Sequence, residues 1–152
     1  MFDTIDSHET RSWTPDEGEP NIYNTIRWHP KTSDGIVLAC DTEGMLTKFN
    51  NTSGEKEEFK SESDDKNPLA ALDYNFDGSM FVAGGDDYKV RYYDDETMKC
   101  VCMSDPDWTG KGGHINRVFC AKFNPIDKNI VATSGWDMNV IIHDIRGKLY
   151  NL

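Results

Sequence analysis

Residues 113–146 read GHINRVFCAKFNPIDKNIVATSGWDMNVIIHDIR, and this stretch decides the fold. It opens with Gly-His and continues with apolar residues at Val118, Ala121 and Phe123, which a turn of Asn-Pro-Ile-Asp follows. Two β-branched runs, at residues 130–133 and 140–142, are separated by Ser-Gly-Trp-Asp. β-Branched residues favour strands, whereas Gly, Asn, Pro and Asp favour turns. The stretch therefore predicts three short strands joined by turns.

The same pattern occurs twice earlier in the chain. The first unit predicts strands at 36–40, 45–49 and 56–60, and the second at 80–84, 88–93 and 99–103. Each is preceded by an apolar set with the spacing seen in the third unit. These sets are Tyr23, Ile26 and Trp28, then Leu69, Leu72 and Tyr74. An acid lies six positions before a ring-bearing residue in all three units, and these closing residues are 44 and 50 positions apart. This spacing fits a blade repeat of about 40–45 residues with loop insertions.

Three such units resemble the blades of a WD-repeat propeller. The resemblance implies an all-β fold, with blades of four antiparallel strands. Three blades only are present, which predicts an open or partial propeller. We expect blades at about 21–61, 68–104 and 113–152, so that residues 148–152 alone remain for the last strand. Residues 1–20 hold six acids and one base, and we expect a disordered acidic tail there, with Trp13 as its one large apolar anchor.

The resemblance also implies a buried polar network in each blade. In this family a His, a Ser or Thr on the second strand, the turn Asp and a closing Trp are joined by hydrogen bonds. The third unit matches with His114, Ser134, Asp137 and His143, the last in place of Trp. The second unit offers Asp87 and Tyr93, with Gly84 at the Ser position. The first unit offers Glu43 and Phe49, with Cys40 at the Ser position.

Partner-binding positions follow from the same resemblance. Propellers commonly bind partners at the end that bears the turn after the second strand and the loop into the first strand. The matching positions here are Asn24, Thr42, Ala70, Asp86, Arg117, Phe119 and Trp136. Exposed aromatic residues and Arg often dominate binding energy. The alternative is that Trp136 and Phe119 only pack on a neighbouring loop.

Composition narrows the classes of function. The net charge of −11, with Lys and Arg scattered singly, disfavours direct binding of nucleic acid. No apolar run approaches 18 residues and the N-terminus lacks a signal-peptide pattern, so we expect neither membrane insertion nor secretion. The four cysteines form no CxxC pair, which favours free thiols in a reducing compartment. We expect a cytoplasmic protein, with cytoskeletal, ciliary and nuclear locations left open.

No pattern of residues indicates catalysis, a metal site or a cofactor. Residues 73–78 match the first six positions of an EF-hand loop, but the twelfth position, which requires Glu, is Gly84. A hairpin turn explains these residues better. The four histidines show neither a metalloprotease spacing nor a catalytic triad. We therefore predict that the protein is not an enzyme.

An unclosed ring of blades is the main question that the sequence raises. Propellers close with about 4–8 blades, so three blades leave exposed faces and strand edges. The chain is part of a longer propeller, or two copies form a six-bladed ring, or another protein supplies the missing blades. The predicted function is a non-catalytic scaffold for protein–protein interaction within a larger complex. The alternative is a structural component of a cytoskeletal or ciliary assembly.

Overall fold

The computed structural model describes residues 12–13, 22–31, 33, 35–63, 65–109 and 112–146. Within these ranges the regular structure consists of eleven β-strands in three antiparallel sheets. The predicted all-β fold of propeller blades is therefore confirmed. In the described part of the chain, no helix has the length and apolar character needed to cross a membrane.

Each sheet corresponds to one repeat unit, and we call the sheets the first, second and third blade. The first blade comprises β1 (Tyr23–Trp28), β2 (Ile36–Asp41), β3 (Met45–Asn50) and β4 (Lys56–Lys60). The second comprises β5 (Leu69–Tyr74), β6 (Met80–Gly85), β7 (Val90–Asp94) and β8 (Cys100–Ser104). The third comprises β9 (Val118–Phe123), β10 (Ile130–Gly135) and β11 (Val140–Asp144). Its predicted fourth strand, at 148–152, lies outside the described residues.

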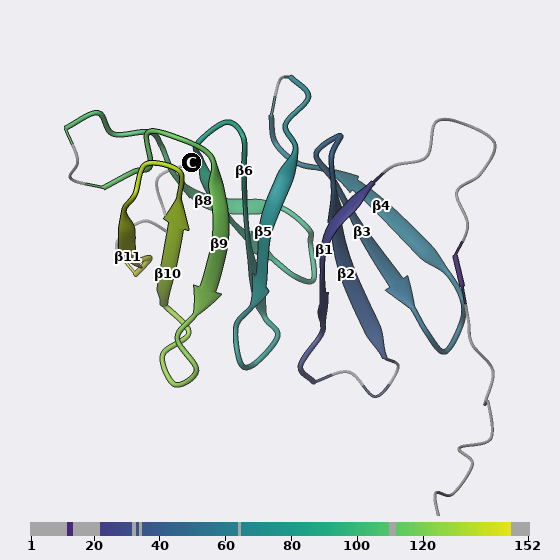
Figure 1. Cartoon of the computed structure of the whole chain (residues 1–152). Helices are drawn as coiled ribbons and strands as arrows, with labels where there is room; N and C mark the ends of the chain where they lie inside the picture. Colours follow the sequence, from purple (N-terminus) through teal and green to yellow (C-terminus); the bar gives the residue numbers. More distant parts are fainter. Residues whose placement is uncertain are drawn as a thin grey trace, which may run out of the picture.

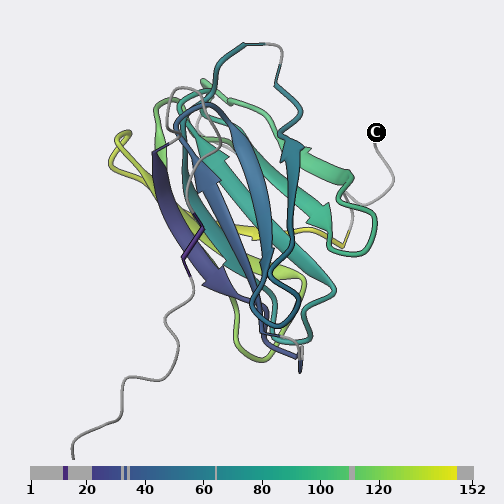
Figure 2. The same ribbon diagram turned by 90° about the vertical axis from the view of Figure 1, so that its right-hand side faces the viewer.

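The blades are arranged in a row, with the second blade between the other two (Figure 1). Their first strands lie side by side, because β5 contacts both β1 and β9. A view from the side of the first blade shows the sheets stacked one behind another (Figure 2). The row therefore ends in an outward sheet face at the first blade and another at the third.

Alternation along the strands creates one apolar core on each side of the second blade. Leu38, Cys40 and Leu46 of the first blade join a cluster with Leu72 and Phe81 of the second. On the other side, residues of the second blade meet apolar residues of the third. This cluster includes Val82, Val90, Tyr92, Val118, Ala121, Phe123 and Val131. Each blade junction is thus built from two facing apolar sheet surfaces.

The turn between the second and third strands of each blade requires a left-handed residue. That residue is Gly44, Tyr88 or Met138, with φ of 86°, 69° and 62°. The predicted strand at 88–93 is consequently wrong at its start, because Tyr88 belongs to the turn and β7 begins at Val90. In each of the three turns an aspartate carboxylate accepts a backbone N–H, which stabilises the turn. These aspartates are Asp41, Asp87 and Asp137.

Trp13 lies against the first blade. Its ring centroid is 5.1 Å from that of Phe49, and its indole N–H donates to the Gly54 carbonyl at 3.1 Å. The anchoring role expected for Trp13 therefore agrees with its contacts. The expected disorder of the acidic tail concerns residues that, apart from 12 and 13, lie outside the described ranges.

Candidate functional site

A buried chain of hydrogen bonds joins the strands of the third blade. His114 Nδ1 lies 2.8 Å from Asp137 Oδ2, and His114 Nε2 lies 2.8 Å from the Thr133 hydroxyl. The same hydroxyl lies 2.7 Å from His143 Nε2. Because a carboxylate only accepts, His114 Nδ1 donates to Asp137, and the Thr133 hydroxyl, which can donate one hydrogen bond and accept another, links the rings of His114 and His143. This arrangement satisfies each of these buried polar atoms.

The hydroxyl in this network belongs to Thr133 and not to Ser134, which corrects the sequence prediction by one position. Thr133 pairs across the sheet with Ala121 and Ile141, on the side that faces the second blade. Ser134 pairs with Cys120 and Val140 and lies on the opposite side. Successive residues of a strand point to opposite faces, so only one of the two hydroxyls can reach the histidines.

Asp137 ties the loop before β9 to the turn after β10. Burial acts to raise the pKa of its carboxyl group, but hydrogen bonds from Asn139, His114 and Ile115 outweigh burial and lower it. The ionised carboxylate accepts the Ile115 N–H at 3.2 Å and the Asn139 N–H at 3.1 Å. The network therefore has a structural role: it holds the loop before β9 against the β10–β11 turn.

The first and second blades have different polar groups at the positions that correspond to the network of the third blade. In the second blade Asp87 forms an ion pair with the buried Arg91, and its backbone N–H donates to Asn67. The predicted member Tyr93 is buried in the apolar core instead, stacked on Phe81 with ring centroids 4.9 Å apart. Burial chiefly raises the pKa of Tyr93.

In the first blade the acid that organises the turn is Asp41, which the sequence interpretation missed. Its carboxylate accepts the N–H groups of Glu43 at 2.9 Å and Met45 at 2.8 Å. Glu43, the predicted acid, forms an exposed ion pair with Lys66. Cys40 lies in the core, where burial chiefly raises the pKa of its thiol to about 12.

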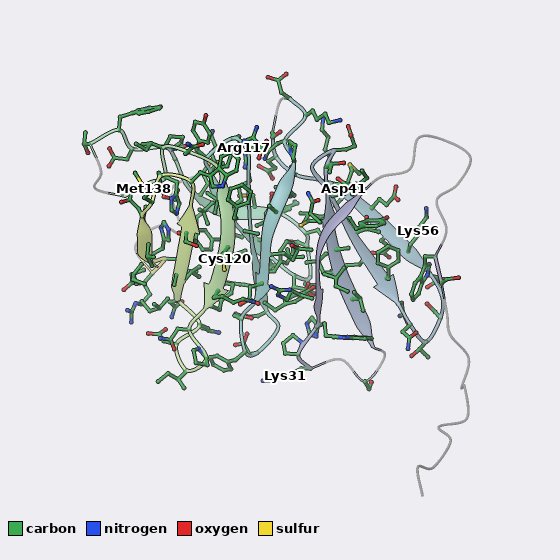
Figure 3. The ribbon with its side chains drawn as sticks, in the orientation of Figure 1. Lys31, Asp41, Lys56, Arg117, Cys120 and Met138 are labelled. Atoms are coloured by element: carbon green, nitrogen blue, oxygen red, sulfur yellow. The ribbon has the colours of Figure 1, made fainter. Side chains whose placement is uncertain are left out.

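Trp136, Phe119 and Arg117 form an exposed cluster at the upper end of the third blade, which we call the Trp136 cluster. The upper end is formed by the β2–β3, β6–β7 and β10–β11 turns (Figures 1 and 3). The rings of Trp136 and Phe119 have centroids 5.1 Å apart, and the Arg117 guanidinium lies 5.4 Å from the Trp136 ring centroid. Trp136 nevertheless remains 62% exposed.

Two further contacts hold this cluster in position. The Trp136 N–H donates to the Arg117 carbonyl at 2.9 Å, which fixes the β10–β11 turn against the loop into β9. The Arg117 guanidinium also pairs with Asp86 of the β6–β7 turn at 3.1 Å. Four predicted binding residues of the second and third blades thus lie together. They are Asp86, Arg117, Phe119 and Trp136.

The predicted positions Asn24 and Thr42 belong to the first blade, which the second blade separates from this cluster (Figure 1). Asn24 donates from its side chain to the Leu69 carbonyl at 2.8 Å, and Thr25 donates to the Ala70 carbonyl at 2.7 Å. Thr42 donates its N–H to the Ile22 carbonyl. Asn24 and Ala70 therefore serve the junction between the first two blades.

Asp73 is a second residue that sequence reasoning missed. Its carboxylate accepts from Lys122 Nζ at 2.8 Å and from the Phe123 N–H at 3.0 Å, both in the third blade. On its other side it accepts from Arg27 Nε of the first blade at 3.2 Å. One side chain of β5 therefore connects all three blades. A cation on each neighbouring strand at the position of Asp73 was the signal in the sequence.

The four cysteines are free thiols. Cys40, Cys100, Cys102 and Cys120 are free, and Cys120 is the exposed one. Burial chiefly raises the pKa of Cys100 to about 11. Among the residues that the structure describes, no three His, Cys, Asp or Glu side chains are placed to hold a metal ion.

Comparison with known proteins agrees with this architecture. The family model "WD domain, G-beta repeat" matches residues 59–94 and 108–144, which contain β5–β7 and β9–β11. Guanine nucleotide-binding protein subunit beta-2 of Caenorhabditis elegans is 26% identical over 120 residues, which cover 78% of this chain and 30% of that protein. Polycomb group protein FIE2 of Zea mays is 25% identical over 134 residues, which cover 86% of this chain and 34% of that protein.

The chain thus spans about a third of the length of the curated relatives that it matches. The matches, the blade topology and the His114–Asp137–Thr133 network agree with one another. The second and third blades match the WD40 repeat, and this match together with the similarity to the two relatives supports a WD-repeat family for the chain.

Proposed function

We propose that this chain is a non-catalytic scaffold for protein–protein interaction that works within a larger complex, with the Trp136 cluster as a partner-binding surface. WD40 repeats indicate a scaffold of this general type. The observation that carries the proposal is the exposed Trp136 ring, which Phe119 and Arg117 hold in one orientation. A large ring that is ordered before binding loses little conformational entropy when it binds.

The charge at this surface suggests the chemistry of the partner. Arg117 already pairs with Asp86, and both side chains are partly exposed, so a partner can compete for either charge. We therefore expect the partner to place an apolar residue on the flat face of the Trp136 ring. Next to that residue, the partner would carry a charged or hydrogen-bonding group that interacts with Arg117 or Asp86. The binding energy then comes mainly from the aromatic contact, because partly exposed ion pairs contribute little.

The test compares the proteins captured by the tagged wild-type chain with those captured by Trp136→Ala. We expect Trp136→Ala to lose specific partners and to keep its melting temperature within a few degrees. Phe76→Ala is the matched control, because Phe76 is an exposed aromatic residue in the β5–β6 turn at the opposite end of the blades. A stability loss of about 3 kcal/mol or more would show instead that Trp136 is a packing residue.

The same experiment separates the scaffold from the structural alternative. A scaffold exchanges partners, so the captured proteins vary with expression and washing. Partners retained at a fixed ratio through stringent washes would favour a structural component of a cytoskeletal or ciliary assembly.

We further propose a cytoplasmic location, which the four free thiols support because such thiols persist in reducing compartments. Imaging of the tagged chain tests that location.

A further inference from the structure

A polar pocket of about 220 Å³ lies at the upper end of the second blade. It is bounded by the loop that joins β4 to β5, which stands at the top of β5, and by the β6–β7 turn (Figure 1). A single water molecule needs only about 10–15 Å³, so the pocket has room for a larger ligand. We call it the Arg91 pocket. The described residues that line it include three cations and three acids, namely Lys66, Lys89 and Arg91, and Glu62, Asp65 and Asp87.

The pocket lies where the third blade has a buried histidine. His114 precedes the first residue of β9 by four positions, and Asp65 precedes the first residue of β5 by four. The two strands align in register, because each begins opposite the last glycine of the second strand of its blade. His114 is 0% exposed and contacts Asp137, whereas Asp65 is exposed. The second blade therefore has an exposed acid where the third has a buried ring, and the pocket lies beside Asp87 instead.

Two buried side chains of the pocket have donors to offer to a ligand. Arg91 and Asn67 line the pocket and are each 2% exposed. Arg91 donates from Nε to the Glu62 carbonyl and from Nη2 to Asp87, and its Nη1 has no partner among the described residues. The Asp87 N–H donates to Asn67 Oδ1, which fixes the orientation of the amide. Within the same part of the chain, Asn67 Nδ2 has no hydrogen-bond partner. Buried donors cost free energy unless an acceptor is supplied, so both donors favour a ligand with acceptor oxygens.

A carboxylate group fits these donors better than other acceptors do. Its two oxygens have about four lone-pair positions, and guanidinium N–H groups bind it in one plane. The equal number of cations and acids in the lining disfavours a ligand with two negative charges, such as phosphate. Lys66 and Lys89 pair with Glu43 and Asp105 in exposed ion pairs. Such pairs contribute little to stability, so both lysines are available to a ligand with one negative charge.

We propose that the Arg91 pocket binds a carboxylate group, which accepts hydrogen bonds from Arg91 Nη1 and Asn67 Nδ2, with Lys66 and Lys89 as cations at the rim. The carboxylate belongs to a small free acid or to an acidic side chain of a peptide, and the test separates these two sources. The pocket shares no residue with the Trp136 cluster, so this inference does not depend on the proposed function.

The test follows side-chain signals of the nitrogen-15-labelled chain by proton–nitrogen NMR at constant pH. Sodium acetate is titrated into the protein, and sodium chloride at equal ionic strength is the reference. We expect acetate alone to give saturable shifts of the Arg91 Nε–H and Asn67 amide signals. Free glutamate and a capped tripeptide with one central glutamate then separate the two sources. Tighter binding of the free acid identifies a small molecule, and tighter binding of the tripeptide identifies a peptide.

Asn67→Asp is the decisive variant, because it keeps the acceptor for the Asp87 N–H and replaces the donor by an acceptor of the same shape. Followed by the Arg91 Nε–H signal, acetate binding should weaken about tenfold or more. Asn124→Asp is the matched control and should bind acetate like the wild type. Asn124 also accepts backbone N–H groups through its side-chain oxygen, but in the β9–β10 turn at the lower end of the blades.

The amide spectrum of each variant shows whether it is folded. Lys89→Gln changes an exposed rim cation, should weaken acetate binding about threefold, and replaces Asn67→Asp if that variant does not fold. Equal shifts with acetate and chloride would show that water alone satisfies the buried donors, and would overturn the proposal. Tighter binding of phosphate than of acetate, or unchanged acetate binding in folded Asn67→Asp, would also overturn it.

Discussion

At the scale of single residues, the Thr133 hydroxyl connects two buried histidines. It is both donor and acceptor between the rings of His114 and His143, and all three residues are buried. A hydroxyl is suited to this position because it supplies one proton and accepts another. The closing residue, His143, contacts this hydroxyl through a ring nitrogen, at the position where the family has the indole nitrogen of Trp.

Thr133→Val keeps the shape of the side chain and removes the hydroxyl. His114 Nε2 and His143 Nε2 then lose this partner in a buried place, and each unsatisfied group costs about 1–3 kcal/mol. We expect a loss of about 2–4 kcal/mol in the free energy of unfolding, measured by urea denaturation. Ser134→Ala is the control and should change stability by less than about 0.5 kcal/mol. Equal losses in both variants would contradict the network.

The choice between Thr133 and Ser134 shows where sequence reasoning stops. Strand positions were predictable because β-branched runs and turn residues alternate clearly in all three units. The network position was not, because two hydroxyl residues are adjacent and only the register of β10 decides which one faces the second blade. Asp41 was missed for a related reason, since nothing in its unit distinguishes it from the neighbouring acid Glu43.

Exposed positions are less predictable still. The sequence placed Trp136, Phe119 and Arg117 at one end of a blade, but their mutual stacking depends on turn geometry. The Trp136 N–H bond to the Arg117 carbonyl fixes that geometry and leaves no pattern in the sequence. Candidate surfaces can therefore be located from repeat spacing, whereas the orientation of their side chains needs coordinates.

At the scale of elements, β5 holds the row of blades together through Asp73. Its carboxylate faces a cation from each neighbouring first strand, Arg27 from β1 and Lys122 from β9. It also accepts a backbone N–H of Phe123, which a solvent molecule would otherwise have to satisfy. The contact is partly shielded, since the Asp73 side chain is only 16% exposed.

Asp73→Ala removes two ion pairs and one hydrogen bond, and we expect a loss of about 1–2 kcal/mol in unfolding free energy. Asp73→Asn should lose less, because its amide oxygen still accepts the Phe123 N–H. Denaturation at low and high salt separates the contributions, since only the ion pairs are screened. Asp144→Asn is the control, because Asp144 pairs with Arg146 of its own blade on the surface. A larger loss for Asp144→Asn would contradict the role of Asp73.

At the scale of the whole molecule, the three blades are not equivalent. The second blade is covered on both sides, because one apolar core joins it to the first blade and another joins it to the third. Stability in repeat architectures is a sum of intrinsic repeat terms and nearest-neighbour interfaces. The second blade has two such interfaces within the chain and each outer blade has one. The outer blades should therefore open before the second blade does.

Native-state hydrogen exchange measures this order directly. We expect the slowest amide exchange in β6 and β7, whose residues are almost all buried, and faster exchange in β4 and β11, whose residues are mostly exposed. Uniform exchange across the three blades would show that the row unfolds as one unit and that the two internal junctions are too strong for the blades to open separately.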